Sequence, residues 1–295
     1  MTDNIRQAVQ KEKKLTMADL TTKELPTWCL ACGDFNILYA LKSAIAELNL
    51  DPANTLIVSG IGCGSKVPHF VRTYGFEGLH GRAIPVATGA KLANRDLTVI
   101  VVAGDGDTYG IGANHFMQAM RRNVDITLIV QNNEVYGLTK GQYSPTSPKG
   151  FVSSSTPSGA LEEAVNPIML ALSVGATYVA RGYSYEVLHF KELIKGGIQH
   201  KGFALIDCFQ PCSTYNKVNT LQWHKENLCK LDGSHNPADI NAAMAKALET
   251  EKYPIGLFYK TQKPTYEDGL PQMQKPLVQH DINNIDIEKL LDRFK

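Results

Sequence analysis

The stretch LTVIVVAGDGDTYGIG, residues 97–112, decides the fold class of this chain. Its first half is a continuous apolar run, which is typical of a central parallel strand that is covered on both faces. Its second half is a glycine-rich turn that leads into a segment with helical periodicity. Glycines in such a turn let the backbone approach an anion, and the amino end of the following helix favours negative charge. The stretch therefore predicts a strand, an anion-binding turn and a helix.

Asp105 lies in this turn, where its carboxylate would repel a bound phosphate. A divalent cation between the two anions removes the conflict, because Mg²⁺ binds carboxylate and phosphate oxygens together. Asn133 follows 28 positions later (133 − 105), after one predicted helix and one predicted strand, so neighbouring strands bring both residues to one edge. A flavodoxin-like or Rossmann-like phosphate loop is the alternative, although the first strand-to-helix junction lacks the G-x-G-x-x-G pattern of a dinucleotide site.

Helix-like and strand-like segments alternate along the rest of the chain. Helices are predicted at residues 35–50, 83–94, 111–123, 161–174, from 184 onward, and at 236–249 with Asn236 as the N-cap. Strands are predicted at residues 54–60, 97–104, 125–130, 177–180, 203–208 and 255–259. This alternation predicts an α/β fold with an open, mostly parallel sheet and helices on both faces, in which ligands bind at the carboxyl ends of the strands.

Composition narrows the possible partners and the compartment. The chain has 295 residues, 43% hydrophobic and 20% charged, enough for one large α/β domain or two modest ones. The formal net charge of +1 gives no electrostatic reason to propose nucleic acid or an anionic membrane as a partner. The apolar runs are strand-sized, and the lysine-rich start lacks the apolar core of a secretory signal. We therefore expect a cytoplasmic protein without a membrane span.

The predicted domain organisation has three parts. Residues 1–25 form a polar extension, residues 26–260 form the main domain, and residues 261–295 form a tail that we expect to contact another subunit. Within the domain, residues 137–159 are rich in proline, glycine and serine. This composition favours a functional loop, a partner contact or disorder over a regular core element.

Four of the six cysteines occur in a pattern that suggests a metal site rather than disulfides. Cys29 and Cys32 form the C-x-x-C of WCLACGD. Cys63 in GIGCGSK and Cys212 in FQPCSTYN each follow a predicted strand, at the same edge as the glycine-rich turn. Four thiolates fit either a tetrahedral zinc site or a [4Fe–4S] cluster, and spacing alone does not separate the two.

Six motifs in a fixed order closely resemble the β subunit of 2-oxoacid:ferredoxin oxidoreductases, across roughly residues 26–218. They are WCLACGD, GIGCGS, LHGRAIPVATGAKLA, GDGD, NNEVYGLTKGQ and PCSTYN. The resemblance implies the thiamine diphosphate-binding fold, with Mg²⁺ held by Asp105, the Asn133 side chain and the Val135 carbonyl. It also places the backbone amides of Gly106 and Asp107 near the diphosphate. The remaining residues that it assigns to the cofactor site are Gly104, Cys63, Gly64, Ser65 and His80.

The same resemblance implies one [4Fe–4S] cluster beside the thiamine diphosphate. Its ligands would be Cys29, Cys32, Cys63 and Cys212, so the main domain would hold both cofactors. Cys208 is the fallback for the fourth ligand, but its place inside a predicted strand favours a buried core thiol. Cys229 matches no motif.

The resemblance further implies the oxidative decarboxylation of a 2-oxoacid with coenzyme A, which yields an acyl-CoA, CO₂ and reduced ferredoxin. Four basic residues are candidates for contacting carboxylates or phosphate in that reaction: Lys66, His80, Arg82 and Lys140. Thiamine enzymes also need a carboxylate against the aminopyrimidine ring, and the sequence shows no second α/β unit that would carry it. By resemblance an α subunit supplies that group, so we expect an αβ or α2β2 enzyme that is active only with its α subunit.

The substrate preference follows from one segment. YGLTKGQYSPT, residues 136–146, is more similar to 2-oxoglutarate enzymes than to pyruvate enzymes, which favours 2-oxoglutarate. Pyruvate, branched-chain and broad-range 2-oxoacid enzymes are the alternatives within this class. In a different class, the chain would be a zinc-stapled, non-catalytic phosphate-binding subunit.

Overall fold

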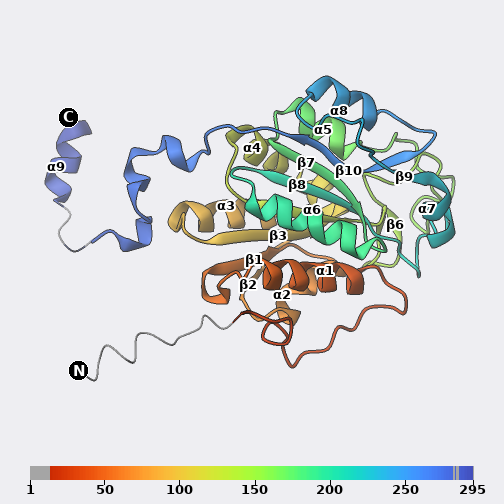
Figure 1. The fold of residues 1–295 in the computed structure, drawn as a ribbon, viewed down its shortest axis with the longest axis horizontal. Coiled ribbons are helices and arrows are strands. Elements are labelled where there is room, and N and C mark those ends of the chain that lie inside the picture. The colour runs from red at the N-terminus through yellow and green to blue at the C-terminus, as the bar shows by residue number, and fades with distance from the viewer. Residues whose placement is uncertain (1–13, 282, 284–285, 295) are drawn as a thin grey trace.

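A central sheet organises the chain, of which this computed structural model describes residues 14–281, 283 and 286–294. The eight strands lie in the order β2-β1-β3-β4-β8-β7-β10-β9 (Figure 1). All neighbouring pairs are parallel except β10 and β7, so the sheet is open and mostly parallel as predicted. The strands are β1 (Thr55–Ser59), β2 (Tyr74–Glu77), β3 (Thr98–Gly104), β4 (Thr127–Asn132), β7 (Tyr178–Tyr183), β8 (Ala204–Phe209), β9 (Leu228–Lys230) and β10 (Tyr253–Lys260).

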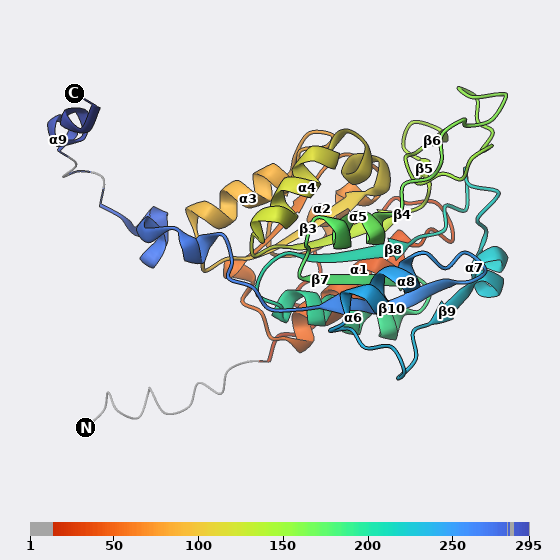
Figure 2. The same ribbon diagram turned by 90° about the horizontal axis from the view of Figure 1, so that it is seen from above.

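Helices cover both faces of this sheet (Figure 2). One face packs against α1 (Asp34–Glu47), α2 (Val67–Phe70) and α6 (Val187–Gln199). The other face packs against α3 (Ala83–Ala93), α4 (Ala113–Arg122), α5 (Pro167–Ser173) and α8 (Ile240–Ala247).

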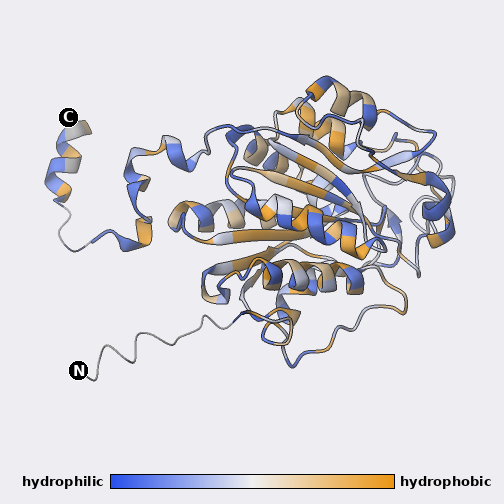
Figure 3. Cartoon of the chain, viewed as in Figure 1, coloured by the Kyte–Doolittle hydropathy of each residue, from blue (hydrophilic) through white to orange (hydrophobic). Residues whose placement is uncertain are grey.

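The apolar run of β3 is explained by this double cover. Val99 and Val101 belong to the core on the α3 side, whereas Ile100 and Val102 belong to the core on the α1 side. A strand that is buried on both faces needs apolar residues at every position rather than at alternate ones. Figure 3 shows the central strands as predominantly hydrophobic and the helices as two-sided.

Three predicted helices begin three or more residues later than expected, and the one expected from residue 184 begins at Val187. The helix expected at 161–174 begins only at Pro167, because the Asn166 side chain accepts a hydrogen bond from the Met169 amide and caps it. The helix expected from Asn236 begins at Ile240, because Asp239 is the residue whose side chain caps the first turn. The sequence analysis also missed several short elements: β2, β9, α2, α7 (Leu221–Asn227) and the hairpin of β5 (Val135–Tyr136) and β6 (Gln142–Tyr143).

Both terminal segments contact the domain over part of their length. Leu20 is fully buried, and Thr21 pairs with Val71, so the predicted polar extension packs on the domain before residue 25. In the predicted tail Met273 is fully buried. The helix α9 (Ile287–Leu291) lies apart from the sheet in Figure 1. No helix in the described part of the chain combines the length and the hydrophobicity needed to cross a membrane.

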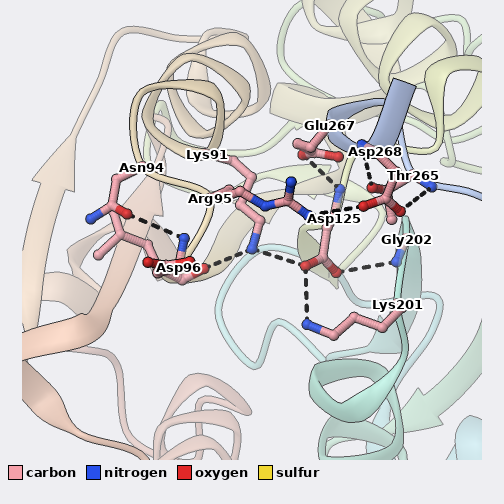
Figure 4. Close-up of polar contacts among 11 residues, drawn as sticks. Lys91, Asn94, Arg95, Asp96, Asp125, Lys201, Gly202, Thr265, Glu267 and Asp268 are labelled. Atoms are coloured by element: carbon pink, nitrogen blue, oxygen red, sulfur yellow. Dashed lines mark hydrogen bonds and ion pairs between the residues drawn. The ribbon is translucent and has the colours of Figure 1, made fainter. Parts of the chain in front are cut away.

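An ionic network joins the start of the tail to the amino-terminal edge of the sheet (Figure 4). The Lys91 ammonium lies 2.9 Å from the Asp125 carboxylate, which also accepts from the Gly202 amide. The Glu267 carboxylate in turn accepts a hydrogen bond from the Asp125 amide, and the pair of Arg95 and Asp268 lies beside it. Burial alone would raise the pKa of Asp125, but the Lys91 ammonium and the hydrogen bonds outweigh burial and lower it.

We predict that Lys91→Met lowers the free energy of unfolding by about 3 kcal/mol, because it removes the buried partner of a carboxylate. The matched variant Lys201→Met should cost less than about 1 kcal/mol, since Lys201 pairs with the same carboxylate from an exposed position. The pKa of Asp125 is lower in the folded chain than in the unfolded one. Its stabilisation is therefore complete above the unfolded value of about 3.9 and is lost as the pH falls through the folded value.

Denaturant unfolding of both variants between pH 3 and 7 measures this difference. The penalty of Lys91→Met should shrink as the pH falls below about 4. Equal penalties for the two lysine variants at pH 7 would contradict the assignment.

Candidate functional site

The glycine-rich turn begins at the carboxyl end of β3 and continues as a short π-helical segment, Gly106–Ile111, before α4. A Cβ atom at Gly106 would overlap the ring of Tyr136, so a larger residue does not fit there. The Tyr136 hydroxyl donates to the Gly106 carbonyl at 3.1 Å and holds this ring over the turn. The glycine is thus required by a close approach of side chain to backbone.

A cavity of about 150 Å³ opens at this turn, between the ends of β1, β3 and β4. It is lined by all but one of the residues that the sequence assigned to the cofactor: Gly104, Asp105, Gly106, Asp107, Asn133, Val135, Cys63, Gly64 and His80. The exception is Ser65, which is fully buried and does not line the cavity. The predicted cofactor residues are therefore close together, although they come from separate segments of the chain.

Asp105 is held by a serine- and threonine-rich strap whose role the sequence analysis did not predict. The hydroxyls of Ser144 and Thr146 both donate to its Oδ2 atom. Ser147 donates to the Glu134 carbonyl and ties the strap to the end of β4. Burial raises the pKa of Asp105 to about 6, and the two hydroxyl hydrogen bonds act in the opposite direction. The run of hydroxyls in SPTS was the available signal for this strap within the loop 137–159.

A second cavity, of about 120 Å³, contains the four cysteines that the sequence selected. Cys29, Cys32, Cys63 and Cys212 all line it. A Cβ atom built on Gly137 would lie 3.6 Å from the Cys63 sulfur and 3.8 Å from the Cys212 sulfur. Cys208 is fully buried in β8 and Cys229 lies in β9, and neither lines this cavity.

Cys29 is exposed, whereas burial and hydrogen bonds affect the other three thiols of this cavity. Gln210 Nε2 donates to the Cys32 sulfur at 3.3 Å, and the Tyr215 amide donates to the Cys212 sulfur at 3.5 Å. Burial, followed by the charge of Asp34, raises the pKa of Cys63 to about 11 and that of Cys32 further. Burial thus disfavours the thiolate forms of Cys32 and Cys63, and a bound cationic group would stabilise them.

The two cavities are adjacent. Cys63, Asn133, Gly137 and Leu138 line both of them. Asn133 also donates to Gln210 at 3.0 Å, and Gln210 donates to the Cys32 sulfur. One hydrogen-bonded path therefore leads from the wall of the glycine-turn cavity to a thiol of the other.

The four basic candidates are not gathered at one place. His80 lines the glycine-turn cavity, and Lys66 lines the thiol cavity instead. Arg82 is exposed and contacts His115 at 2.8 Å. Lys140 is exposed at a backbone φ of 80°, and neither Arg82 nor Lys140 lines either cavity.

Glu134 is a buried residue that the sequence analysis missed. Its backbone φ is 58°, and its carboxylate accepts a hydrogen bond from Asn219. Burial, together with the charges of Asp105 and Asp207, raises the pKa of Glu134 to about 8. A non-glycine residue at positive φ costs free energy, and such strain is concentrated at functional sites. The one signal in the sequence for Glu134 was an acidic residue inside the NNEVYG motif.

Comparison with known proteins identifies the family. Residues 60–208 match the family described as thiamine pyrophosphate enzyme, C-terminal TPP binding domain, and residues 212–275 match the C-terminal part of the pyruvate ferredoxin oxidoreductase beta subunit. The 2-oxoacid:ferredoxin oxidoreductase subunit beta of a Sulfolobus species is 50% identical over 84% of this chain and 87% of its own length. The chain belongs to this family of β subunits.

Other members of the family are linked to 2-oxoglutarate by name. The 2-oxoglutarate synthase subunit KorB of Methanocaldococcus jannaschii is 36% identical over 85% of this chain and 93% of its own length. A solved 2-oxoglutarate:ferredoxin oxidoreductase from Magnetococcus marinus, with 2-oxoglutarate, coenzyme A and succinyl-CoA bound, is 39% identical with a TM-score of 0.90. That alignment covers 97% of this chain and 98% of the solved one. The predicted family, fold and enzyme class are confirmed, and a thiamine diphosphate-binding domain is present.

If Asp105 holds Mg²⁺ and the diphosphate, as the sequence predicts, Thr146→Val should weaken thiamine diphosphate binding about 10- to 100-fold, the usual effect of losing a residue that orients such a carboxylate. Valine keeps the shape of threonine but cannot donate to Asp105. Titration calorimetry of the purified enzyme with thiamine diphosphate measures the change. Ser154→Ala, at an exposed position of the same loop, should leave the affinity unchanged. A Thr146→Val enzyme with normal affinity would show that the Thr146 hydroxyl is not needed to orient Asp105.

Proposed function

We propose that this chain is the thiamine diphosphate-, Mg²⁺- and [4Fe–4S]-binding subunit of a 2-oxoglutarate:ferredoxin oxidoreductase. The reaction would convert 2-oxoglutarate and coenzyme A into the acyl-CoA and CO₂, with the electrons passed to ferredoxin. The shared wall between the glycine-turn cavity and the four-cysteine cavity carries this proposal. With thiamine diphosphate in the first cavity and the cluster in the second, electrons taken from the substrate would have a one-electron acceptor directly across this wall.

The cofactors supply the difficult chemistry, since thiamine diphosphate acts as an electron sink at the carbon that loses CO₂ and the cluster takes up single electrons. The residues of this chain would position these cofactors. Gly106 leaves room beneath Tyr136 for the turn, and Asn133 lies on the wall between the two cavities. The hydrogen bonds to the sulfurs of Cys32 and Cys212 would tune the cluster potential.

The donor set fits Mg²⁺ at the glycine turn. Asp105 and Asn133 offer carboxylate and amide oxygens, and Val135 offers its main-chain carbonyl, which are oxygen ligands that Mg²⁺ prefers. Asp105 is buried, which disfavours its ionised form and raises its pKa to about 6. A divalent cation would stabilise the ionised carboxylate and offset that cost of burial.

The cysteine set fits a [4Fe–4S] cluster in the number and kind of its donors. Four cysteines line one cavity, as a cluster or a single zinc ion requires. Among residues 14–281, 283 and 286–294, no three or more histidine, cysteine or acidic side chains are arranged to hold one metal ion. The resemblance of the six motifs to 2-oxoacid:ferredoxin oxidoreductases is the reason that we propose a cluster rather than zinc.

An α subunit would complete the enzyme over the mouths of these cavities. Leu138 lines both cavities and is exposed, and Leu30, next to Cys29 in the chain, and Leu79, next to His80, are exposed as well. Exposed apolar groups that gather around a polar site are typical of a surface that another chain covers. Lys66 and His80 are the basic residues that we propose to contact substrate or cofactor from this chain, whereas Arg82 and Lys140 would act only through contacts that form in the complex.

We predict that Cys212→Ser removes the cluster, because a serine hydroxyl does not replace a thiolate ligand. Cys229→Ser should keep it, since Cys229 lies in β9 outside the cavity. Electron paramagnetic resonance of dithionite-reduced, anaerobically purified enzyme, with iron and sulfide analysis, distinguishes the two. A colourless wild-type protein with stoichiometric zinc would refute the cluster and favour the zinc-stapled alternative.

We also predict that 2-oxoglutarate is turned over with a kcat/KM at least about tenfold above those of pyruvate and 2-oxoisovalerate. A second carboxylate gives the preferred substrate a charged group that a matched site can recognise, and each such interaction contributes more than a methylene does. Anaerobic reduction of methyl viologen by the complex with the α subunit, with coenzyme A present, measures all three. Equal values would support the broad-range alternative, and a preference for pyruvate would contradict the proposed substrate.

A further inference from the structure

Asp107, two residues beyond the predicted Mg²⁺ ligand, has a side chain that the glycine-turn motif leaves without a role. The structure shows it almost fully buried. Its Oδ1 atom accepts hydrogen bonds from the Ile61 amide at 3.1 Å and from the Gly81 amide at 2.8 Å. The same oxygen lies 2.8 Å from Nδ1 of His80.

These partners come from separate segments of the chain. Ile61 belongs to the loop after β1 that carries Cys63, and Gly81 follows β2. Asp107 itself belongs to the turn after β3, and the strands lie side by side in the order β2-β1-β3. One carboxylate oxygen therefore fastens the cysteine loop, the histidine loop and the glycine turn to one another.

The Asp107 carboxylate is packed tightly against the backbone at Gly60. A Cβ atom at Gly60 would overlap Oδ2 of Asp107, so an alanine there would push directly on the carboxylate. Gly60 does not have a positive φ, and its substitution would act through this contact rather than through backbone strain.

The hydrogen bond to Asp107 also selects which nitrogen of His80 faces the cavity. An ionised carboxylate can only accept, so Nδ1 must carry the proton, and Nε2 is the nitrogen left for a ligand. The ring is held further by an edge contact with Tyr136 at a centroid distance of 5.9 Å. His80 is thus presented to the cavity in one orientation and one tautomer.

We infer that Asp107 is a positioning residue, which fixes the tautomer of His80 against the thiamine diphosphate and locks the Cys63 loop to the glycine turn. This inference rests on the proposed function for the identity of the reaction, and on the observed contacts for the role of the carboxylate. Asp107 thereby fixes the position of the glycine-turn cavity relative to the Cys63 wall of the thiol cavity. Asp107 itself does not touch the reacting atoms.

Asp107→Ala in the complete enzyme tests the inference. Alanine removes the oxygen that accepts from Ile61, Gly81 and His80, so nothing confines the imidazole proton to Nδ1. Asp107→Asn is the conservative variant, because its amide oxygen can take the place of Oδ1 and accept from all three donors. We expect kcat of Asp107→Ala to fall about 10- to 100-fold, as for other residues that orient a catalytic histidine or ligand, with KM for the 2-oxoacid changed less than about twofold and most of the loss restored in Asp107→Asn. Nitrogen-15 spectra of histidine-labelled enzyme should show the proton of one histidine confined to Nδ1 in the wild type and in Asp107→Asn but not in Asp107→Ala.

Three further variants separate positioning from simple loop support. Gly60→Ala should reproduce the loss, because it displaces the same carboxylate. In a His80→Gln background Asp107→Ala should cost little more, since the two residues act as a unit. Asp96→Ala, which removes an exposed carboxylate at the opposite edge of the sheet, is the matched control and should behave as wild type. Wild-type kinetics and a histidine proton still confined to Nδ1 in Asp107→Ala would overturn the inference.

A failure of the proposed function can be distinguished from a failure of the inference about Asp107. If the wild-type complex oxidises no 2-oxoacid, that proposal fails. The role of Asp107 is then decided by thiamine diphosphate affinity and by the histidine spectrum, neither of which requires turnover. An unchanged affinity together with an unchanged tautomer overturns it, and a changed tautomer with weaker binding supports it.

Discussion

Parallel pairing of β1, β3, β4 and β8 is the constraint on which the rest of this structure depends. In the β3–β4 pair Gly104 lies opposite Gln131, so the residues that follow them, Asp105 and the NNEVYG segment, leave the sheet side by side. In the β4–β8 pair Asn132 lies opposite Phe209, which brings Asn133 next to Gln210. A shift of one strand by one residue would exchange the side chains that it presents to the two faces, and the packed cores on both sides disfavour this exchange.

The site that this edge creates is rich in buried carboxylates. Asp207 accepts hydrogen bonds from the Tyr109 hydroxyl at 2.8 Å and from Asn132 at 3.1 Å, and pairs with Arg181 at 3.3 Å. Burial nevertheless raises the pKa of Asp207, as it does for Asp105. Burying charge costs free energy unless partners compensate it, and a cation that binds only the folded state would add to stability by mass action. Binding of the proposed Mg²⁺ at Asp105 would therefore offset part of the cost of burying these carboxylates.

The fold could be predicted where a strand is buried on both faces, because such a strand is an unbroken apolar run in the sequence. The site could be predicted where the kind of residue, such as cysteine or aspartate, is enough to indicate its role. The runs that became β3, β4 and β8 are apolar on both faces, whereas β2 and β9 are short strands without such a run. Cys212 could be preferred to Cys208 because it follows its strand, and the two do separate, one into the thiol cavity and the other into the core. Side-chain direction could not be predicted. Nothing in GDGD shows that Asp107 turns away to two backbone amides and the His80 imidazole, or that Thr146, distant in sequence, turns back to Asp105.

The contacts of Asp105 and Asp107 give a reason why this chain would need a partner subunit. Two carboxylates line the described part of the glycine-turn cavity, Asp105 and Asp107. The first is held by Ser144 and Thr146, and the second by Ile61, Gly81 and His80. If thiamine diphosphate binds with its diphosphate at this turn, as we propose, carboxylates that are anchored there by several donors would not reach the aminopyrimidine ring at its far end. Activation of that ring would then fall to a residue outside these two, and the exposed Leu138, which lines both cavities, lies where a partner subunit that brings this residue would bind.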